Sequence, residues 1–581
     1  MTMTRHHPAP ATSVPTRTVA EVAGRLLATL GVTTCFGVVG SGNFHLTNAL
    51  IAAGVPFVAA RHEGGAVTMA DAYARTSGAL VAVSVHQGPG FTNALTGLTE
   101  AAKSRTPLLV LAPETANPRS NFAVDQEAIV RATGALYLRV SRPESAADVL
   151  VSAVRQARAG RGTVVVGLPL HVLAAPATGE PRSVPMPLAA PAEPASERDV
   201  ATLAEALATA ERPVIVAGRG ARDAQPYLER LADRVGALPA TSAAAHGLFA
   251  GHDFDLGLLG GFSTPAVADL AAEADLVVAW GCSLTGWTTR HGRLIHPAAR
   301  VIHVDHRPEG LAATHPRTGA GAEVIGGDCA RTAVAVLDAL GGRLPYAREG
   351  YRTPAVRERL RAGRRWNRLP IADPATEAGR VDPRALAARL DRLLPEERTL
   401  VTDSGAFMGY PIAYLDVPDE AGFCFTQAFQ SIGLGLATGI GAALARPDRL
   451  TVAALGDGGA LMGMADLETA VRLRLPLLVV VFNDDAYGAE VHHFTGHPLD
   501  AVTFPEVDLA AIAAGYGCAA ATVRDLAGLA AVTDWLREPT RPLLVDAKVS
   551  RELTPWWLED AFVGHSAPPA PAAGTAAGHA P

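Results

Sequence analysis

Residues 451–490 read TVAALGDGGALMGMADLETAVRLRLPLLVVVFNDDAYGAE, and their pattern predicts the fold class. It holds two apolar runs, Thr451–Leu455 and Leu477–Phe482, each of the length of a buried strand. Between them lie the glycine-rich loop Gly456–Gly459 and a segment with apolar residues at helical spacing, Ala465–Arg474. A strand, a loop, a helix and a second strand in this order predict two parallel strands.

An acidic residue follows each of these two strands. Asp457 lies in the glycine-rich loop, and Asp484 follows the second strand. Parallel strands end at the same edge of a sheet, where ligands of such sheets bind. Mg²⁺ takes few protein oxygens and completes its shell with phosphate and water. The alternative is a surface turn in which both aspartates only cap helices. Two acidic clusters after neighbouring strands favour a diphosphate held through a divalent cation.

The pattern Gly456-Asp457-Gly458 followed by Asn483-Asp484 resembles the signature of thiamine diphosphate (ThDP) enzymes. The resemblance implies that Asp457, Asp484 and the main-chain carbonyl of Ala486 bind Mg²⁺. Many members of the family have asparagine where this chain has Asp484. The cofactor contacts that it implies in this stretch are Gly456, Asp457, Gly458, Gly459, Asp484 and Tyr487.

Composition limits the class of protein. The net charge of −7 gives no sign of binding to nucleic acid or to an anionic membrane, and no apolar run is long enough to span a bilayer. The five cysteines are odd in number and widely separated, which fits reduced thiols in a cytoplasmic protein.

The length of 581 residues predicts several domains, and strands that alternate with helices predict α/β domains with doubly wound sheets. Together with the resemblance, this implies two ThDP-binding domains flanking a Rossmann-like middle domain. The expected segments are a disordered N-terminus (1–16), a pyrimidine-binding domain (17–175), a linker (176–196), the central domain (197–345), a connecting segment (346–380), a diphosphate- and Mg²⁺-binding domain (381–563) and a disordered tail (564–581).

Glu63 is the strongest catalytic candidate of the first domain. It lies in the run Arg61-His-Glu-Gly-Gly, just ahead of a helical pattern, where the alternative is an ordinary first-turn glutamate. The run resembles the segment of ThDP enzymes that carries the glutamate in contact with the aminopyrimidine of the cofactor. That chemistry needs a carboxyl group which shares a proton with a pyrimidine nitrogen.

A second loop, Gly88–Asn93, resembles the family's loop over the pyrimidine and implies that Gly90 and Asn93 contact the cofactor. His86 precedes this loop and aligns with an active-site histidine of benzoylformate decarboxylase, while Ser41 matches a carboxylate-binding serine of that enzyme. The alternative for His86 is a polar loop histidine. A second active-site histidine of that enzyme has no clear match, because the alignment falls near Thr288.

Two further catalytic candidates come from the resemblance. Gln126, in Asp125-Gln126-Glu127, matches a glutamine of acetolactate synthases that reaches the active site of the neighbouring subunit; a polar residue at a helix start is the alternative. Glu490 matches the active-site glutamate of pyruvate decarboxylases, a proton donor after decarboxylation. His492 and His493 either line the same opening or belong to a polar helix face.

The third domain supplies the remaining cofactor contacts. A strand that ends at Thr402 is followed by Asp403, Ser404 and Gly405, which match the family's diphosphate loop. Ile432 matches the large aliphatic residue that wedges between the two rings of the cofactor, and a core isoleucine is its alternative.

The sequence of the central domain does not decide whether the protein binds FAD. Its Gly218-x-Gly220 turn lacks the full dinucleotide fingerprint, and Gly281–Arg290 departs from the FAD-binding turn of acetolactate synthases. His246 lies either in a substrate-facing loop or on the surface.

The resemblance implies non-oxidative decarboxylation of a 2-oxo acid through an enamine, followed by protonation or carboligation. It also implies a homodimer or homotetramer with the active site between subunits. A ThDP-dependent oxidase or acyltransferase stays open, as does a non-catalytic protein of the same fold.

Overall fold

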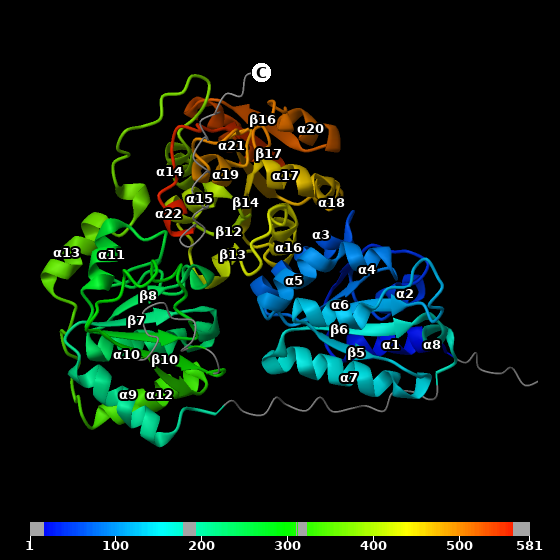
Figure 1. Cartoon of the computed structure of the whole chain (residues 1–581), viewed down its shortest axis with the longest axis horizontal. Coiled ribbons are helices and arrows are strands. Elements are labelled where there is room, and N and C mark those ends of the chain that lie inside the picture. The colour runs from blue at the N-terminus through cyan, green and yellow to red at the C-terminus, as the bar shows by residue number, and fades with distance from the viewer. Residues whose placement is uncertain (1–16, 178–192, 309–310, 312–321, 562–581) are drawn as a thin grey trace, which may run out of the picture.

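The computed structural model describes residues 17–177, 193–308, 311 and 322–561. These residues form three units, each built around one parallel sheet (Figure 1). The predicted disordered ends, 1–16 and 564–581, and most of the predicted linker 176–196 lie outside the described residues.

The N-terminal unit, at the right of Figure 1, has the strand order β2-β1-β3-β4-β6-β5. Its strands are β1 Cys35–Gly37, β2 Phe57–Ala59, β3 Val81–Ser84, β4 Leu108–Glu114, β5 Leu136–Arg139 and β6 Thr163–Pro169. Its helices are α1 Val19–Thr29, α2 Phe44–Ala52, α3 Glu63–Ser77, α4 Pro89–Asn93, α5 Leu95–Lys103, α6 Gln126–Thr133, α7 Ala146–Gln156 and α8 Leu170–Ala174.

The central unit has the strand order β11-β10-β9-β7-β8. Its strands are β7 Pro213–Ala217, β8 Leu238–Thr241, β9 Leu276–Trp280, β10 Arg300–Asp305 and β11 Glu323–Gly326, and its helices are α9 Glu197–Thr209, α10 Gln225–Val235, α11 Pro265–Ala272 and α12 Cys329–Gly341. Helix α13, Pro354–Gly363, then leads toward the third unit and packs through buried Val356 and Leu360. The arginine-dense connecting segment is therefore anchored by apolar residues, and only its outer face is exposed.

The C-terminal unit has the strand order β13-β12-β14-β15-β17-β16. Its strands are β12 Arg398–Thr402, β13 Phe423–Phe425, β14 Leu450–Gly456, β15 Leu477–Asn483, β16 Ala519–Val523 and β17 Leu543–Lys548. Its helices are α14 Pro383–Leu393, α15 Gly409–Tyr414, α16 Gly435–Ala445, α17 Asp457–Gly463, α18 Leu467–Arg472, α19 Gly488–His493, α20 Leu509–Tyr516, α21 Ala530–Trp535 and α22 Leu558–Ala561.

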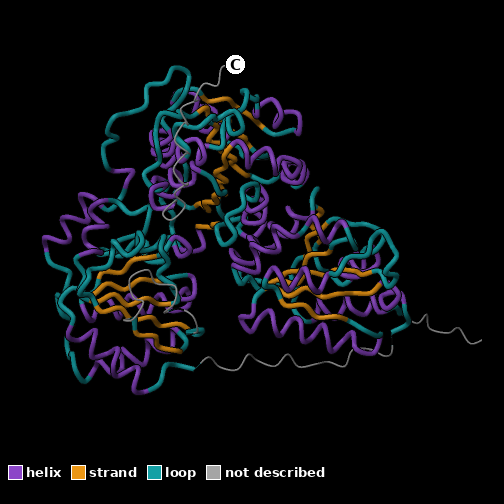
Figure 2. The backbone as a smooth tube through the Cα atoms, viewed as in Figure 1, coloured by secondary structure: helices purple, strands orange, loops and turns teal. Residues whose placement is uncertain are grey.

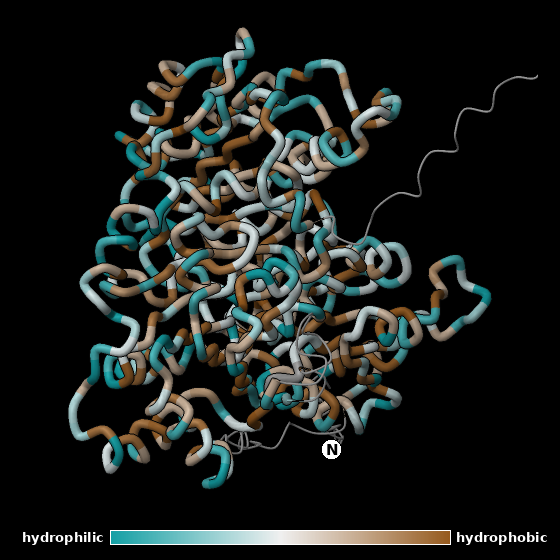
Figure 3. The backbone as a smooth tube through the Cα atoms, turned by 60° about the vertical axis from the view of Figure 1, so that its left-hand side comes forward, coloured by the Kyte–Doolittle hydropathy of each residue, from teal (hydrophilic) through white to brown (hydrophobic). Residues whose placement is uncertain are grey.

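The strands lie inside layers of helices (Figure 2). Every residue of the inner strands β6 and β15 is buried, and these strands are mostly valine and leucine. A parallel sheet covered on both faces needs such continuous apolar runs, which appear as brown segments within the molecule in Figure 3. The α/β fold class and the three-sheet architecture predicted from the sequence are confirmed.

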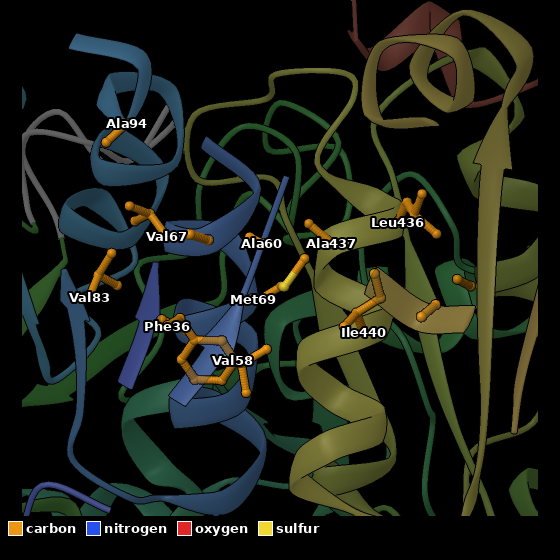
Figure 4. Packing of buried hydrophobic residues seen from close by; sticks show 14 of the residues in the cluster. Phe36, Val58, Ala60, Val67, Met69, Val83, Ala94, Leu436, Ala437 and Ile440 are labelled. Atoms are coloured by element: carbon orange, nitrogen blue, oxygen red, sulfur yellow. The ribbon is translucent and has the colours of Figure 1, made fainter. Parts of the chain in front are cut away.

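The N-terminal and C-terminal units pack directly through α3 and α16. Met69 of α3 points toward Ala437 and Ile440 of α16 in one continuous apolar core (Figure 4). A Cβ atom on Gly441 would lie 2.2 Å from the carbonyl oxygen of Met69, so the two backbones are in contact. This close approach fixes how the two units sit relative to each other within one chain.

Within the described ranges, no helix combines the length and apolarity needed to cross a membrane. All five cysteines are buried and free, as the odd number and wide spacing predict.

Candidate active site

The two aspartates singled out by the sequence lie side by side at the carboxyl edge of the C-terminal sheet. Strands β14 and β15 run parallel, with Gly456 opposite Phe482. Asp457 is the first residue of α17, and Asp484 follows the end of β15. The expectation of a loop over Gly456–Gly459 is wrong: the chain passes directly from strand into helix at Gly456, whose extended backbone (φ −86°, ψ 161°) is the usual conformation of a helix N-cap.

Burial and neighbouring negative charge disfavour the ionised form of both carboxylates. Burial raises the pKa of Asp484, and the nearby charge of Asp457 raises it further. Burial also raises the pKa of Asp457. In the described part of the chain, no three His, Cys, Asp or Glu side chains gather as a metal site. The pair therefore suits a cation that takes its other ligands from a main-chain carbonyl, such as that of Ala486, and from phosphate and water.

A cavity of about 540 Å³ opens in front of the pair. The residues that line it include these predicted cofactor and catalytic positions: Ser404, Gly405, Ile432, Gly456, Asp457, Gly458, Gly459, Asp484, Ala486, Tyr487 and Glu490. Ile432 is half-buried and faces this cavity, so it is not an ordinary core isoleucine.

Glycines form the floor of this cavity, so the backbone there is not covered by side chains. A Cβ atom on Gly458 would lie 2.7 Å from the ring of Tyr487, and one on Gly459 would lie 2.3 Å from Oδ2 of Asp403. Gly405 has φ +139°, a conformation that side chains disfavour. Bare backbone beside two carboxylates fits a diphosphate bridged to a divalent cation.

The side chain of Asp403 lies behind the wall of the cavity and does not line it. Its side chain has no exposed surface. Its carboxylate accepts hydrogen bonds from the amides of Ser404 (2.8 Å) and Gly433 (2.9 Å). Asp403, predicted to contact the cofactor, therefore fixes the turn that presents Ile432. Its burial raises the pKa of this carboxyl to about 6.

A buried ionic network behind Asp484 was not anticipated. Asp485 has φ +52°, which is unusual for a residue other than glycine. Arg380 donates to the Asp485 carboxylate, and Lys548 forms an ion pair with Asp546 at 3.2 Å. The Asn483 amide donates to Asp546 at 2.8 Å. The only sequence signal was Lys548, a charge at the end of an apolar strand.

Glu490 and His492 share the opening of the cavity. Both lie on the short helix α19 and line the cavity. Burial lowers the pKa of His492, whose Nδ1 lies 3.3 Å from the hydroxyl of Thr554. Of the two interpretations of His492, the cavity-facing one agrees with the structure.

The N-terminal unit presents a second group of predicted residues. Glu63 is the first residue of α3, and its Oε2 accepts a hydrogen bond from the amide of Asn93 at 3.1 Å. A Cβ atom on Gly90 would lie 3.1 Å from Oε1 of Glu63. Gly90 thus keeps one side of the carboxylate open, while Asn93 orients the other.

Ser41 and His86 also meet in this unit, although the sequence separates them by 45 positions. The serine hydroxyl lies 3.4 Å from Nε2 of His86, and Nδ1 lies 2.8 Å from the carbonyl oxygen of Gln87. Since a carbonyl only accepts, Nδ1 donates to it, and in this tautomer Nε2 is the acceptor. Two residues that sequence reasoning missed support the pair: Asn43 accepts from the Gly40 amide, and Phe122 packs against the imidazole.

Gln126 lies apart from both groups. It is buried at the start of α6, where its amide donates to the carbonyl of Pro113 at 2.8 Å and lines a separate cavity of about 460 Å³. Its Oε1 has no hydrogen-bond partner among the described residues. Whether it serves a neighbouring subunit stays a prediction.

The two groups do not share a cavity within one chain. The cavity with Asp457 and Asp484 is lined by the C-terminal unit, and neither Glu63 nor His86 contributes to it. A cofactor that contacts both groups therefore has to bridge surfaces that a single chain holds apart.

Comparison with known proteins assigns the family. Three models of the thiamine pyrophosphate (thiamine diphosphate) enzyme match the chain: the N-terminal binding domain at residues 17–132, the central domain at 200–336 and the C-terminal binding domain at 403–547. The Pseudomonas aeruginosa protein named probable 2-ketoarginine decarboxylase is 31% identical, over 88% of this chain and 90% of that protein. A sulfoacetaldehyde acetyltransferase of Rhodobacter capsulatus is 29% identical, over 94% and 96%.

Among solved structures, the thiamine diphosphate-dependent 4-hydroxybenzoylformate decarboxylase of Rhodococcus jostii RHA1 superposes with a TM-score of 0.76. It shares 23% identity, covers 92% of this chain and 99% of its own, and thereby supports the fold. The three domain matches and the relative at 31% identity show that this chain belongs to the thiamine pyrophosphate enzyme family.

Proposed function

We propose that this protein decarboxylates a 2-oxo acid without oxidation, using thiamine diphosphate and Mg²⁺, and then protonates the remaining fragment or joins it to a second carbonyl compound. The observation that carries the proposal is the cavity that Asp457, Asp484 and the bare glycine backbone line together with Glu490. For this reaction the C-terminal unit has to provide a binding site for the metal and diphosphate, and a proton donor.

Bound thiamine diphosphate supplies the electron sink that accepts the electron pair left when CO2 departs. The side chains of the protein transfer protons and orient the cofactor and the substrate. Glu63, oriented by Asn93, holds or shares a proton with the pyrimidine ring. Asp457, Asp484 and the carbonyl of Ala486 would hold the cation, and Ile432 would support the bound cofactor from the wall of the same cavity.

Ser41 and His86 orient the carboxylate of the substrate. The serine hydroxyl donates to a carboxylate oxygen, and the imidazole takes up or returns a proton at Nε2, the nitrogen left free by the Gln87 contact. Glu490 then delivers a proton to the carbon that loses CO2, and half-buried His492 beside it limits the access of water. Gln126 of a neighbouring subunit completes the site.

The proposed enzyme is a homodimer or a homotetramer with Glu63 of one subunit facing Asp457 of another. Support comes from the separation of the two groups within one chain. The buried free thiols support a cytoplasmic location.

Product analysis by mass spectrometry tests the reaction. The protein is incubated with thiamine diphosphate and Mg²⁺ and with pyruvate, phenylpyruvate or benzoylformate. Release of CO2 with an aldehyde indicates a decarboxylase, and a 2-hydroxyketone indicates a carboligase. The Asp457→Asn variant is the matched control and should give neither. Consumption of the 2-oxo acid that persists in this variant, or in the absence of the cofactor, would contradict the proposal.

A second candidate is an acyltransferase, favoured by the likeness to the Rhodobacter capsulatus protein over nearly the whole chain. In this reaction the donor is an aldehyde with a leaving group on the neighbouring carbon, as in sulfoacetaldehyde. Sulfite leaves with the electron pair, so the two-carbon fragment reaches the acyl oxidation level without an external oxidant and is passed to phosphate. An acyl phosphate that forms only when phosphate is added would select this candidate.

A further inference from the structure

A second cavity, of about 800 Å³, lies between the central and C-terminal units. It opens at the carboxyl ends of three strands of the central sheet: Gly218 and Arg219 follow β7, Ser242 follows β8, and Gly281 follows β9. Ligands of doubly wound sheets bind at this edge. The position and size of the cavity therefore suit a small molecule.

This cavity adjoins the one that holds the aspartate pair. Ser404, Gly405, Gln430 and Ala489 line both cavities. Gln430, at the junction, has φ +62°, a strained conformation of the kind that concentrates at binding sites. A molecule that reacts at one end in the first cavity has room to extend its other end into the second.

Arg219 is a cation that the described protein leaves without a counter-ion. It is half-buried, lines the second cavity, and forms no hydrogen bond or ion pair with the described residues. Burial and the charges of Arg75 and Arg222 lower the pKa of Arg219 to about 10. The carboxylate whose charge acts on Arg219, that of Asp71, is already bound by Arg75 and Thr106.

Other groups on the wall of this cavity are also hydrogen-bond donors. The amide nitrogen of Gln427 is buried and has no partner among the described residues. Ser242, Ser283 and Thr285 also line this cavity, and a hydroxyl group can donate as well as accept. The carboxylate there, Asp560, is engaged by Arg290 and Arg293. Asp560 is the one acidic residue among the described residues that line this cavity, and it is already paired, so Arg219 is left as a charged donor without a carboxylate partner on the wall.

We propose that this cavity receives the distal end of the 2-oxo acid, and that Arg219 and Gln427 bind an oxyanion there. The preferred substrates would then be 2-oxo acids that carry a second acidic group remote from the 2-oxo group. This inference rests on the proposed function, which supplies the reacting end. A neutral tail leaves the Arg219 charge uncompensated in a partly desolvated site, and a cationic tail is repelled by it.

Equilibrium binding tests the anion site without turnover. Isothermal titration calorimetry measures the binding of adipate and of hexanoate to the full-length protein loaded with thiamine diphosphate and Mg²⁺. We expect adipate to bind more tightly than hexanoate, and Arg219→Met to weaken adipate binding by about tenfold or more, as for a charge-assisted hydrogen bond. Arg219→Lys should restore part of the loss.

The control variant is Arg361→Met, which removes an exposed arginine on α13 that lines a different cavity. It should bind adipate like the wild type. Gln427→Leu is a second test of the same pocket and should also weaken adipate binding. Equal adipate binding by the wild type, Arg219→Met and Gln427→Leu would overturn the proposal.

Turnover gives the second readout. The ratio of kcat/KM for 2-oxoadipate to that for 2-oxohexanoate should exceed one in the wild type and fall toward one in Arg219→Met. An unchanged ratio would overturn the proposal. If no 2-oxo acid is turned over, the proposed function fails, while the calorimetry still decides whether Arg219 binds an anion.

Binding of a nucleotide in this cavity would contradict its assignment to the substrate. ADP and FAD are titrated into the same proteins. If either nucleotide binds, displaces adipate and loses affinity in Arg219→Met, the cavity is a nucleotide site and the substrate proposal is wrong.

Discussion

The Glu63 carboxylate is a single group on which the proposed reaction depends. It has one side-chain hydrogen bond, from Asn93, and Gly90 keeps its other oxygen accessible. Glu63→Gln keeps the shape of the side chain but cannot share a proton as an acid. We expect kcat to fall by about 10²- to 10⁴-fold, the usual contribution of a proton-transfer group.

The measurement is steady-state decarboxylation with saturating cofactor. Glu127→Gln, which removes an exposed carboxylate at the start of α6, serves as the control and should retain activity. A Glu63→Gln variant with wild-type kcat would remove Glu63 from the mechanism.

His246 couples stability to pH. It lies between the central and C-terminal units, where its ring packs against Phe423 at 5.2 Å. It is therefore an interface histidine, which neither sequence interpretation described. Burial, with a smaller contribution from Arg365, lowers the pKa of His246 from 6.5 to about 4. The unfolded chain then binds more protons than the native chain between these values, so native stability falls as the pH drops from about 6.5 to about 4.

His246→Met should abolish this part of the acid sensitivity. At pH 5 the wild type should lose about 1–2 kcal/mol relative to pH 7.5 through this half-buried ring, and the variant should not. Thermal unfolding midpoints at the two pH values measure the difference. The exposed His171→Met variant is the control. Identical pH dependence in the wild type and His246→Met would rule out this role.

At the scale of elements, the loop after β15 is held by charges that lie outside the cavity. Arg380 donates to Asp485 and to the main-chain oxygen of Val549 at 3.1 Å, and so ties the loop to the end of β17. The Arg380→Met substitution keeps the Asp484 carboxylate but removes contacts that hold its loop in position. Because groups behind metal ligands typically contribute 10- to 100-fold in affinity, we expect about tenfold weaker Mg²⁺-dependent cofactor binding.

Activation curves with Mg²⁺ at fixed thiamine diphosphate measure this effect. Arg446→Met removes an outer ion pair with Asp448 and should leave the curves unchanged. If Arg380→Met has wild-type activation constants but a lower melting temperature, the network only stabilises the fold.

The contact between α3 and α16 depends on the absence of a side chain at Gly441. Alanine normally favours a helix over glycine, but here its methyl group meets the backbone oxygen of Met69. Gly441→Ala should therefore destabilise the protein by about 1–3 kcal/mol, the usual cost of overpacking.

Thermal or urea unfolding measures this change. Gly341→Ala is the matched control, because a Cβ atom at this helical glycine meets nothing within 4 Å, and it should be neutral or slightly stabilising. Equal effects of both substitutions would mean that the two helices separate easily.

At the scale of the whole molecule, the site is divided between two units that do not share a cavity within one chain. If Glu63 of one subunit serves Asp457 of another, a heterodimer of Glu63→Gln and Asp457→Asn chains contains one intact site. Random mixing of the two inactive variants should then restore about a quarter of the wild-type activity in a twofold-symmetric dimer.

The assay compares each variant alone with the mixture after dissociation and reassociation. A mixture that stays inactive, while its subunits demonstrably exchange, would place the whole site within one chain.

The sequence alone determined the strand–helix repeat and the acidic pair. Strands β14 and β15 were predicted to within one residue of their observed bounds, because strands covered on both faces must be continuously apolar. The spacing of Asp457 and Asp484 was sufficient to place them together, since consecutive parallel strands end at one edge. Strands β5, β8, β11, β13, β16 and β17 were not recognised; most are short and lie at sheet edges, where local patterns are weak.

Which polar residues meet across long stretches of chain depends on tertiary packing. The contact between Ser41 and His86, the burial of Asp403 under the Ile432 turn, and the lack of a counter-ion at Arg219 depend on distances that no local pattern encodes. Local periodicity reports which face of an element is buried. Hydrogen bonds and charge balance depend on how separate elements pack, and that is settled when the three sheets come together.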